Sequence, residues 1–152
     1  MTTTYKSALE KIGVTIPAHL EADAQVPVLD EPQAQGDLLL VPLHLDQAPT
    51  PAENEWETVP DEGIAVVRGE GTGNTHWLHR GFDSPGVAYA TNNAEDLGPS
   101  DTGLVIGFVR VPAGQCAELI HTDDHGCNAL APGDWAIRRK REQGYTVKIV
   151  AD

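Results

Sequence analysis

The chain has 152 residues, and its 23 acidic side chains outnumber its 10 Lys and Arg side chains, giving a formal charge of −13. One domain of ordinary size is expected, with a core large enough to fold without disulfides or a structural metal. The negative charge excludes a nucleic-acid reader, because such a protein places Lys and Arg against phosphates.

Membrane insertion and export are not predicted either. No apolar run reaches the roughly 20 residues needed to cross a bilayer, and the first residues lack the charged and apolar regions of a signal peptide. We expect a cytoplasmic protein, or a virion protein if the chain is phage-encoded, without a membrane partner. Cys116 and Cys127 are expected to be two reduced thiols, because two cysteines do not make a disulfide framework.

The first predicted element is a short helix over residues 4–12. Tyr5, Leu9 and Ile12 recur at helical spacing between N-capping threonines and a glycine that suits a C-cap. Three turns of helix are not stable alone in water, so this helix must pack on the body of the protein or on a partner. The same three side chains are therefore candidate partner-binding residues.

The next segment, residues 14–36, shows neither helical nor strand periodicity and contains three prolines. We expect an extended arm that becomes ordered on a partner, with a disordered leader as the alternative. The chain is thus divided into a helix and arm over residues 1–36 and a β-rich domain over residues 37–152.

From residue 37 onward the pattern alternates between short apolar runs and turn residues, which predicts seven or eight strands. The predicted strands cover residues 38–45 with an interruption at Pro42, 64–68, 76–80, 87–91, 104–111, 117–121, 135–142 and 145–150. With one helix and no alternation of strands and helices, the fold class is mainly β, a small sandwich or barrel of jelly-roll type.

The last two predicted strands form a hairpin joined at Gln143–Gly144. Alternation places Trp135, Ile137 and Arg139 on one face of the first strand. Residues 145–150 alternate in the same way, and we expect them to pair with residues 135–142.

Charge is distributed unevenly along the chain. Residues 1–67 carry twelve acids and two lysines, for a net charge of −10, whereas four bases follow one another near the end. Opposite charges of this kind favour head-to-tail contact between copies, and the alternative is a solvated strand whose outward side chains are basic. The candidate partner-binding bases are Arg138, Arg139, Lys140 and Arg141.

Four histidines form two groups, His76 with His79 and His121 with His125. Imidazole is the commonest transition-metal ligand, so these four are candidate metal ligands. On a strand, however, residues three apart point to opposite faces, so His76 and His79 need a turn or bulge between them to share an ion. Loop histidines that hydrogen-bond and stack are the alternative.

Other sites have weaker patterns. Residues 69–74 are rich in glycine but lack the Lys-Ser/Thr pair of a phosphate-binding loop, which favours a turn. No Gly-x-Ser-x-Gly element supports a hydrolase, and no catalytic residue is assigned. A third hypothesis is a small-ligand or inhibitor module whose pocket is lined by aromatic residues, namely Trp77, Phe82, Tyr89 and Trp135.

Two segments carry a resemblance to a known family. They are Gly69-Glu70-Gly71-Thr72-Gly73-Asn74-Thr75-His76, and His121 to His125 followed by Leu130-Ala131-Pro132-Gly133-Asp134-Trp135 and the basic run that starts at Arg138. This pattern resembles a family of small uncharacterised β-rich proteins of bacterial and phage genomes. Asn74 replaces the first histidine of the family's Gly-His-x-His element, and the spacing from His121 to His125 is one residue longer. The resemblance implies a β-rich body from about residue 36 onward, and it brings no activity.

Two functional readings follow. The first is a non-catalytic assembly or binding module, such as a phage capsid decoration protein or minor virion protein, whose partner is a second copy or a larger protein assembly. No cofactor is expected in that reading. The second is a metal-dependent small barrel enzyme or sensor resembling a cupin, with a divalent transition metal held by His76, His79, His121 and His125.

Overall fold

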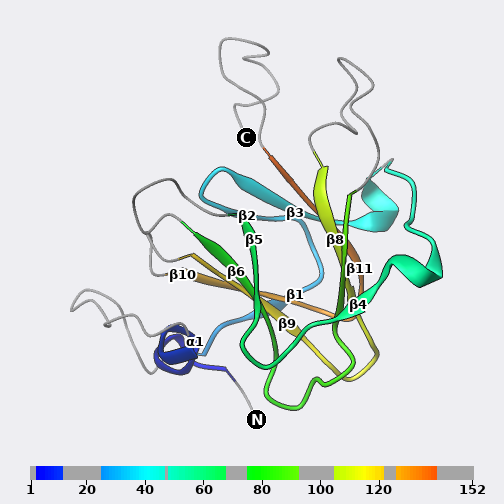
Figure 1. Cartoon of the computed structure of the whole chain (residues 1–152). Helices are drawn as coiled ribbons and strands as arrows, with labels where there is room; N and C mark the ends of the chain where they lie inside the picture. Colours follow the sequence, from blue (N-terminus) through cyan, green and yellow to red (C-terminus); the bar gives the residue numbers. More distant parts are fainter. Residues whose placement is uncertain are drawn as a thin grey trace.

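The computed structural model describes residues 3–11, 25–46, 48–67, 75–92, 105–121 and 126–139. These residues form eleven strands in two sheets and one short α-helix, an open sandwich and not a closed barrel (Figure 1). The predicted mainly β fold class is confirmed, in its sandwich form.

The elements alternate between strands and short turns, as the sequence pattern predicts. In chain order they are α1 (Tyr5–Lys11), β1 (Val28–Leu29), β2 (Gln33–Gln35), β3 (Leu38–Pro42), the 3-10 helices η1 (Leu43–Leu45) and η2 (Glu53–Glu55), β4 (Glu57–Thr58), β5 (Ile64–Val67), β6 (His76–Arg80), β7 (Ala88–Thr91), β8 (Val105–Val111), β9 (Ala117–His121), β10 (Gly126–Leu130) and β11 (Gly133–Arg139).

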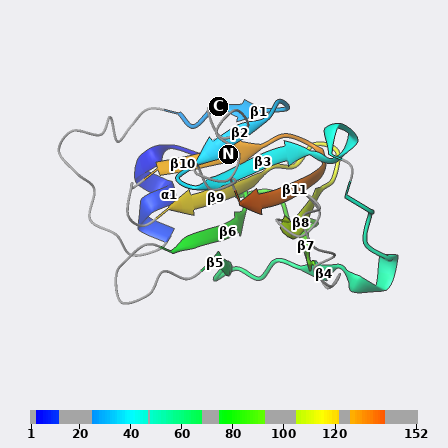
Figure 2. The ribbon, with the colours of Figure 1, turned by 90° about the horizontal axis from the view of Figure 1, so that it is seen from above.

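The five-stranded sheet has the order β1-β10-β9-β6-β5, and the six-stranded sheet has the order β2-β3-β11-β8-β7-β4. Every pair is antiparallel except β1 with β10, which is parallel. Figure 2 places β1 and β2 on one side of the molecule and the edge strands β5 and β4 on the opposite side. That second side faces the reader in Figure 1.

The main core lies between the inner faces of the sheets, the faces that each sheet turns toward the other. Leu38 and Leu40 of β3, with Trp135 and Ile137 of β11, belong to this cluster and come from alternate positions of their strands. Alternation is what allows an antiparallel strand to bury one face. The five-stranded sheet contributes Leu78, Ala117, Leu119 and Leu130, and the remaining buried members come from β7, β8 and the loops.

The outer face of the five-stranded sheet is covered by α1, which confirms the predicted helix. Thr4 caps it, since its Oγ1 accepts the amide hydrogen of Ser7 at 3.1 Å, while Ser7 Oγ accepts the amide hydrogen of Thr4 at 3.0 Å. Leu9 is fully buried in a second cluster with Ile120, Ala129 and neighbouring residues. The helix therefore packs on the body of its own chain.

The outer face of the six-stranded sheet is covered by the segment that carries η1 and η2. Phe108 and Ala136 pack there with Ala48, and the partly buried Trp56 closes the cluster. Residues 43–45 were predicted to continue the first strand. They form a 3-10 helix instead, because Pro42 has no amide hydrogen with which to extend the ladder.

Part of the predicted arm lies in the sandwich. Val28 and Leu29 pair with β10, and β2 forms a hairpin with β3 through the two-residue turn Gly36–Asp37. Gly36 has φ +58°, the left-handed region that such turns require. The boundary expected between residues 36 and 37 thus falls inside a hairpin. Residues 12–24, which include the first part of the arm, lie outside the described residues.

The predicted C-terminal hairpin joins residues 135–142 to residues 145–150, and the structure describes only its first strand, as far as Arg139. Residues 135–139 of β11 pair with β3 on one edge, and residues 133–138 pair with β8 on the other. Residues 135–138 therefore have a neighbouring strand on both edges, and the remainder of the predicted hairpin, residues 140–150, lies outside the described residues. Local alternation identified the strand correctly but did not indicate its neighbours.

Candidate functional site

A stacked pair of buried histidines lies at one end of the inner layer. His76 begins β6 and His121 ends β9, and the two residues are directly opposite in the antiparallel pair. Their rings are parallel within 4°, with centroids 3.9 Å apart, and they are 1% and 3% exposed. The two sequence segments that carry the family resemblance therefore converge at this point.

Three amide side chains link these histidines to both sheets. Gln33 and Gln35 project from β2 across the inner layer, where Gln33 Nε2 donates to the carbonyl of Ala129 at 3.0 Å and Gln35 Nε2 donates to the carbonyl of Leu119 at 2.6 Å. Asn128 of β10 lies between them. Its Nδ2 donates to Gln33 Oε1 at 3.1 Å, and its Oδ1 accepts from Gln35 Nε2 at 2.8 Å.

The backbone carbonyls decide which atom donates and which accepts in each hydrogen bond between these side chains. Since a carbonyl only accepts, the atom of Gln35 that contacts Leu119 must be its NH2 group, and the remaining Oε1 must be an acceptor. His76 Nδ1 lies 2.9 Å from that Oε1 and therefore carries a hydrogen. In neutral His76 the lone pair is then on Nε2. We call the linked side chains of Gln33, Asn128, Gln35 and His76 the amide relay.

The relay ends beside a carboxylate. His76 Nε2 lies 3.7 Å from Oδ1 of Asp37, whose side chain is 73% exposed at the β2–β3 turn. Gly36 brings the turn close to the stacked rings, since a Cβ at this position would lie 3.2 Å from Cε1 of His121. The turn therefore requires glycine for its backbone conformation and for its contact with the imidazoles.

His79 lies on the other face of the same strand. It is opposite Glu118 in the β6–β9 pair, and both side chains are buried. Thr3 Oγ1 donates a hydrogen bond to Glu118 Oε2, which ties the segment that precedes α1 to this sheet. A Cβ at Gly63 would lie 2.6 Å from Cε1 of His79, so Gly63 leaves the space that the imidazole fills.

The three predicted metal ligands that the structure describes are thus distributed over two faces of the sheet. The structure brings His76 and His121 together and places His79 on the opposite face of the sheet, while His125 lies outside the described residues. The lone pairs of an imidazole lie in its ring plane, so two stacked parallel rings do not converge on one ion. Within the described segments no group of three or more His, Cys, Asp or Glu side chains is arranged to hold a metal.

The predicted partner-binding residues also have neighbours in their own chain. Leu9 is buried and Tyr5 packs against the same cluster. Arg138 forms an ion pair with Asp46 at 2.7 Å, and both side chains are largely buried. Arg139 is exposed at the end of β11, whereas Ile12, Lys140 and Arg141 lie outside the described residues.

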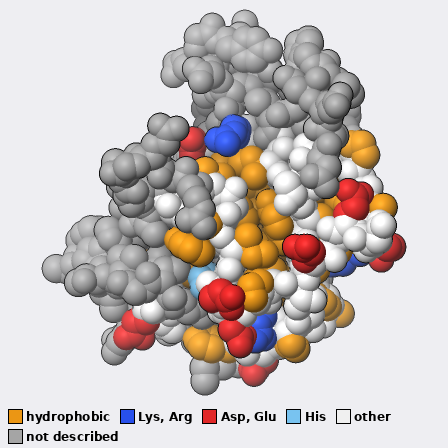
Figure 3. All heavy atoms as spheres, in the orientation of Figure 1, with side chains coloured by type: hydrophobic (Ala, Val, Ile, Leu, Met, Phe, Trp, Pro, Cys, Tyr) orange, Lys and Arg blue, Asp and Glu red, His pale blue; other side chains and the backbone are white. Residues whose placement is uncertain are grey.

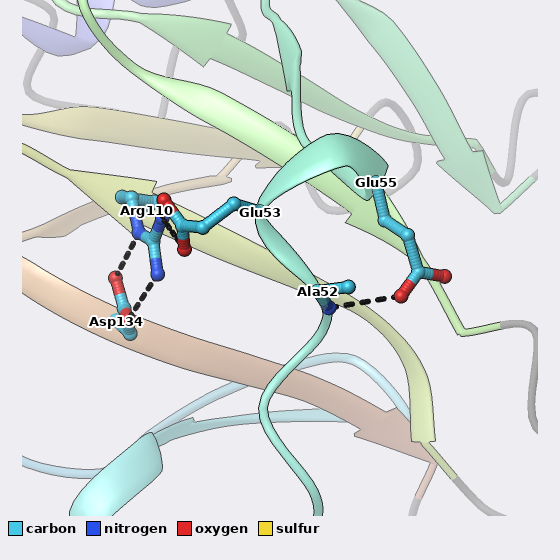
Figure 4. A network of polar contacts seen from close by, with 5 residues as sticks. All are labelled: Ala52, Glu53, Glu55, Arg110 and Asp134. Atoms are coloured by element: carbon cyan, nitrogen blue, oxygen red, sulfur yellow. Dashed lines mark hydrogen bonds and ion pairs between the residues drawn. The ribbon is translucent and has the colours of Figure 1, made fainter.

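A second polar network holds the η2 segment on the outer face of the six-stranded sheet (Figure 4). Arg110 donates two hydrogen bonds to Asp134, at 3.0 and 3.1 Å, and its Nη1 lies 3.0 Å from Glu53 Oε2. Its guanidinium carbon lies 4.2 Å from the ring centroid of Trp56. The hydrogen bond to Asp134 is the largest cause that raises the pKa of Arg110. Through these contacts Arg110 holds the loop that contains η2 against the sheet.

The four aromatic residues of the third hypothesis do not line one pocket. Tyr89 and Trp135 belong to the main core, whereas Trp77 is paired with Ile120 on the outer face and Phe82 is exposed. A hollow of about 290 Å³ lies elsewhere, between Phe108, Asn92 and the segment Pro49–Pro51. Cys116 and Cys127 are free thiols, as expected.

Sequence reasoning missed the residues that orient His76. Gln33 and Gln35 lie on one face of a strand, and Gly36–Asp37 is a two-residue hairpin turn, which is a recognisable signal. Because prolines precede this turn, the sequence pattern predicts an extended arm here and no hairpin. Asn128 lies in β10, a strand with Gly, Cys and Ala that has little intrinsic β propensity.

These features define a class of protein, an open two-sheet β-sandwich with a buried amide and histidine cluster at one end. The chain belongs to the family described as Domain of unknown function (DUF8820), whose model matches residues 34–140. The match runs from within β2 to the end of β11 and so includes strands of both sheets, without β1. Comparisons with curated proteins and with solved structures gave no significant match. In the part of the chain that the structure describes, no helix has the length and apolar character needed to span a membrane.

Proposed function

We propose that this protein is a non-catalytic binding and assembly module that pairs with a second copy of itself along β5. Its setting would be a phage virion, as a decoration or minor structural protein, or the bacterial cytoplasm. The observation that carries the proposal is the edge strand β5. It is the last strand of its sheet, and all four of its apolar residues are only partly buried.

Among the described residues, no further strand pairs with β5 on its outer edge. Ile64, Val66 and Val67 pack against the main core cluster from this strand, yet each keeps part of its surface exposed. Figure 3 shows hydrophobic side chains in a band down the middle of the same face, with acidic side chains beside it. An apolar edge of this kind is the usual site of strand addition, because a further strand satisfies the backbone and covers the side chains.

A second copy suits this edge. Residues 64–67 carry no charge, so two β5 strands can meet antiparallel about a two-fold axis without bringing like charges opposite one another. Asp61 and Glu62 precede β5 in the sequence and Arg68 follows it. In an antiparallel pair, the start of β5 in one copy, which Asp61 and Glu62 precede, lies beside the end of β5 in the other copy, which Arg68 follows.

The test is the mass of the protein in solution, measured by sedimentation velocity over a range of concentrations. The full chain is expected to form a dimer, and the dimer should strengthen as salt is raised, because each copy carries a charge of −13. Ala65→Lys on β5 should weaken dimerisation at least tenfold, since it places a charge at the edge.

Ala34→Lys is the matched control, because Ala34 is an exposed residue of β2, the edge strand of the other sheet. It should leave the dimer unchanged. A wild-type chain that stays monomeric at about 100 µM, a concentration at which weak specific pairs form, contradicts the proposal. Equal dimerisation of the Ala65→Lys variant and the wild type would also contradict it, because the contact would then lie on another surface.

A further inference from the structure

We propose that the C-terminal segment of the same chain, residues 145–150, docks as a short added strand on the outer edge of Thr91, at the end of β7, and covers the hollow beside it. This docking site is independent of the β5 edge, because β7 belongs to the six-stranded sheet. It joins two parts of one molecule and requires no second copy.

β4 covers only part of the outer edge of β7. Its first residue, Glu57, is opposite Tyr89. In an antiparallel ladder the residue opposite Thr91 would be Glu55, but Glu55 ends the 3-10 helix η2 instead. The ladder on this edge of the sheet therefore stops before it reaches Thr91.

The backbone groups of Thr91 point toward this uncovered edge. Val59 N donates to the carbonyl of Val87 at 2.9 Å, on the side of β4, whereas Asn92 N donates to the carbonyl of Ile106 at 3.1 Å, on the side of β8. Successive residues of a paired strand turn their backbone groups to opposite edges, so Thr91 turns its N–H and C=O the same way as Val87. Among the described residues, no strand is paired with Thr91 on this side. An exposed donor and acceptor at a sheet edge favour strand addition.

The hollow beside Thr91 offers an apolar surface to an added strand. Its volume is about 290 Å³, and Phe108, Pro49 and Pro51 are among the residues that line it. Phe108 lies on the outer face of the sheet. An added strand presents every second side chain to that face, so the apolar set Tyr145, Val147 and Ile149 can cover the hollow.

η2 forms one wall of the hollow and is held in place by its own contacts. Glu55 lines the hollow, and its Oε1 accepts the amide hydrogen of Ala52 at 2.9 Å. Glu53 of the same helix is bonded to Arg110 at 3.0 Å (Figure 4). A wall that is already fixed reduces the entropy that docking must overcome.

The end of β11 lies close to this edge. Ile137 is opposite Gly107, and Gly107 is opposite Thr91 on its other side. Two strand spacings, about 10 Å, therefore separate Ile137 from Thr91. The chain leaves β11 after Arg139, at the end of the sheet where β8 begins (Figure 1).

The length and the pattern of the following segment suit this site. Residues 140–144 span up to about 16 Å when extended, which is enough to bring the next residues to Thr91. Residues 145–150 have the alternation of a strand. Residues 135–138 already have a neighbouring strand on both edges, so they cannot be its partner.

Charge also favours the C-terminal segment as the occupant. The wall segment, residues 53–57, carries three acids and no base, and both Glu55 and Glu57 are exposed. Residues 140–152 carry three bases and two acids, in a chain whose net charge is −13. Opposite charges of this kind steer the basic end of the chain toward the acidic wall.

The experiment is amide hydrogen exchange of the full chain, followed residue by residue by NMR at low protein concentration. In the wild type the Thr91 amide is expected to exchange about tenfold more slowly, or slower still, than an exposed amide, because it donates to the added strand. Val147→Asp should return this amide to the rate of an exposed one, since it places a charge against the apolar hollow.

Thr146→Asp is the matched control. It introduces the same charge one residue earlier, where alternation turns the side chain to the opposite face of the added strand, so the Thr91 amide should keep its protection. The Ala90 amide points toward β8 and should stay protected in all three proteins, which checks the fold. Nuclear Overhauser contacts between the Phe108 ring and the methyl groups of Val147 or Ile149 are expected in the wild type.

Three results would overturn the proposal. The first is a Thr91 amide that exchanges in the wild type like an exposed amide. The second is equal protection in Val147→Asp and the wild type, which would mean that another segment covers the edge. The third is protection that grows with protein concentration, which would assign the occupant to a second copy. None of these results bears on dimerisation along β5, which the Ala65→Lys variant tests on the other sheet.

Discussion

Tyr89 and Gly107 share one space in the inner layer, on neighbouring strands β7 and β8. A Cβ built on Gly107 would lie 2.1 Å from the Tyr89 hydroxyl oxygen and 2.5 Å from Cζ of the same ring. Gly107→Ala should therefore lower the free energy of unfolding by about 1–3 kcal/mol, because overpacking forces a buried ring to move. Urea unfolding followed by tryptophan fluorescence measures the change.

Gly126→Ala is the control for this substitution. Gly126 begins β10, and a Cβ built there meets no atom within 4 Å, so its free energy of unfolding should stay within about 0.5 kcal/mol of the wild type. Replacing Tyr89 by a smaller residue in the Gly107→Ala background should recover part of the loss. Equal stability of the two alanine variants would show that the Tyr89 ring moves away without cost.

Burial also changes the acid chemistry of this tyrosine. Desolvation in the core raises the pKa of Tyr89 from 10.0 to about 12. Above pH 10 the unfolded chain loses the hydroxyl proton of Tyr89, while the folded chain keeps it. The contribution of this group to the free energy of unfolding is therefore complete below pH 10 and is lost as the pH rises toward 12. Comparison of the wild type with Tyr89→Phe isolates the effect from other groups that titrate in this range.

The expected size follows from the pKa difference. The free energy of unfolding of the wild type, minus that of Tyr89→Phe, should fall by about 1.4 kcal/mol between pH 8 and pH 11. The reason is that pH 11 lies one unit above the pKa of the unfolded chain, and each such unit costs that amount. Urea unfolding at both pH values measures it. A constant difference between the two proteins would mean that the hydroxyl titrates alike in the folded and unfolded chains.

Helix α1 is expected from the sequence to pack on the body of the protein or on a partner, and in the structure it packs on the body. Its spacing correctly predicted a helix with an apolar stripe, and the stripe packs against β9 and β10 of the same chain. Leu9→Ala should therefore lower the global free energy of unfolding by about 2–5 kcal/mol, the usual cost of removing a fully buried leucine. Urea unfolding monitored by circular dichroism tests this.

The matched measurement is amide hydrogen exchange in β9 and β10. If α1 belongs to the cooperative core, exchange there should accelerate in the Leu9→Ala variant. If the helix were a detachable docking arm, only residues of the helix itself would lose protection. That outcome would support the prediction that Tyr5, Leu9 and Ile12 serve a partner.

Strand identity and strand pairing differed in how far they could be predicted. β5, β6, β8 and β9 were located from apolar runs between turn residues, to within one or two residues at their ends. The neighbours of β11 were not, because pairing with β3 joins residues almost a hundred positions apart. β1, β2, β4 and β10 were missed since they are short or poor in β-branched residues, and neighbouring strands hold them in place.

At the scale of the whole molecule, the sandwich separates three surfaces with different roles. The inner layer holds the main core and, at one end, the amide relay. One outer face is covered by α1 and the other by the loop clamped through Arg110. The side along β5 is the surface that we propose for association, and the charge of −13 would make such association dependent on salt.

The sequence by itself determined the mainly β class, the short helix with its cap, the alternating core positions and the acidic character, because each depends on local spacing or composition. Only the tertiary structure decided that His76 meets His121 and Gln35 while His79 faces away, and that Leu9 is buried. The physical reason is that these contacts join distant residues across two strand pairings and one sheet packing. Local periodicity fixes which residues share a face, but the pairing of strands selects what that face meets.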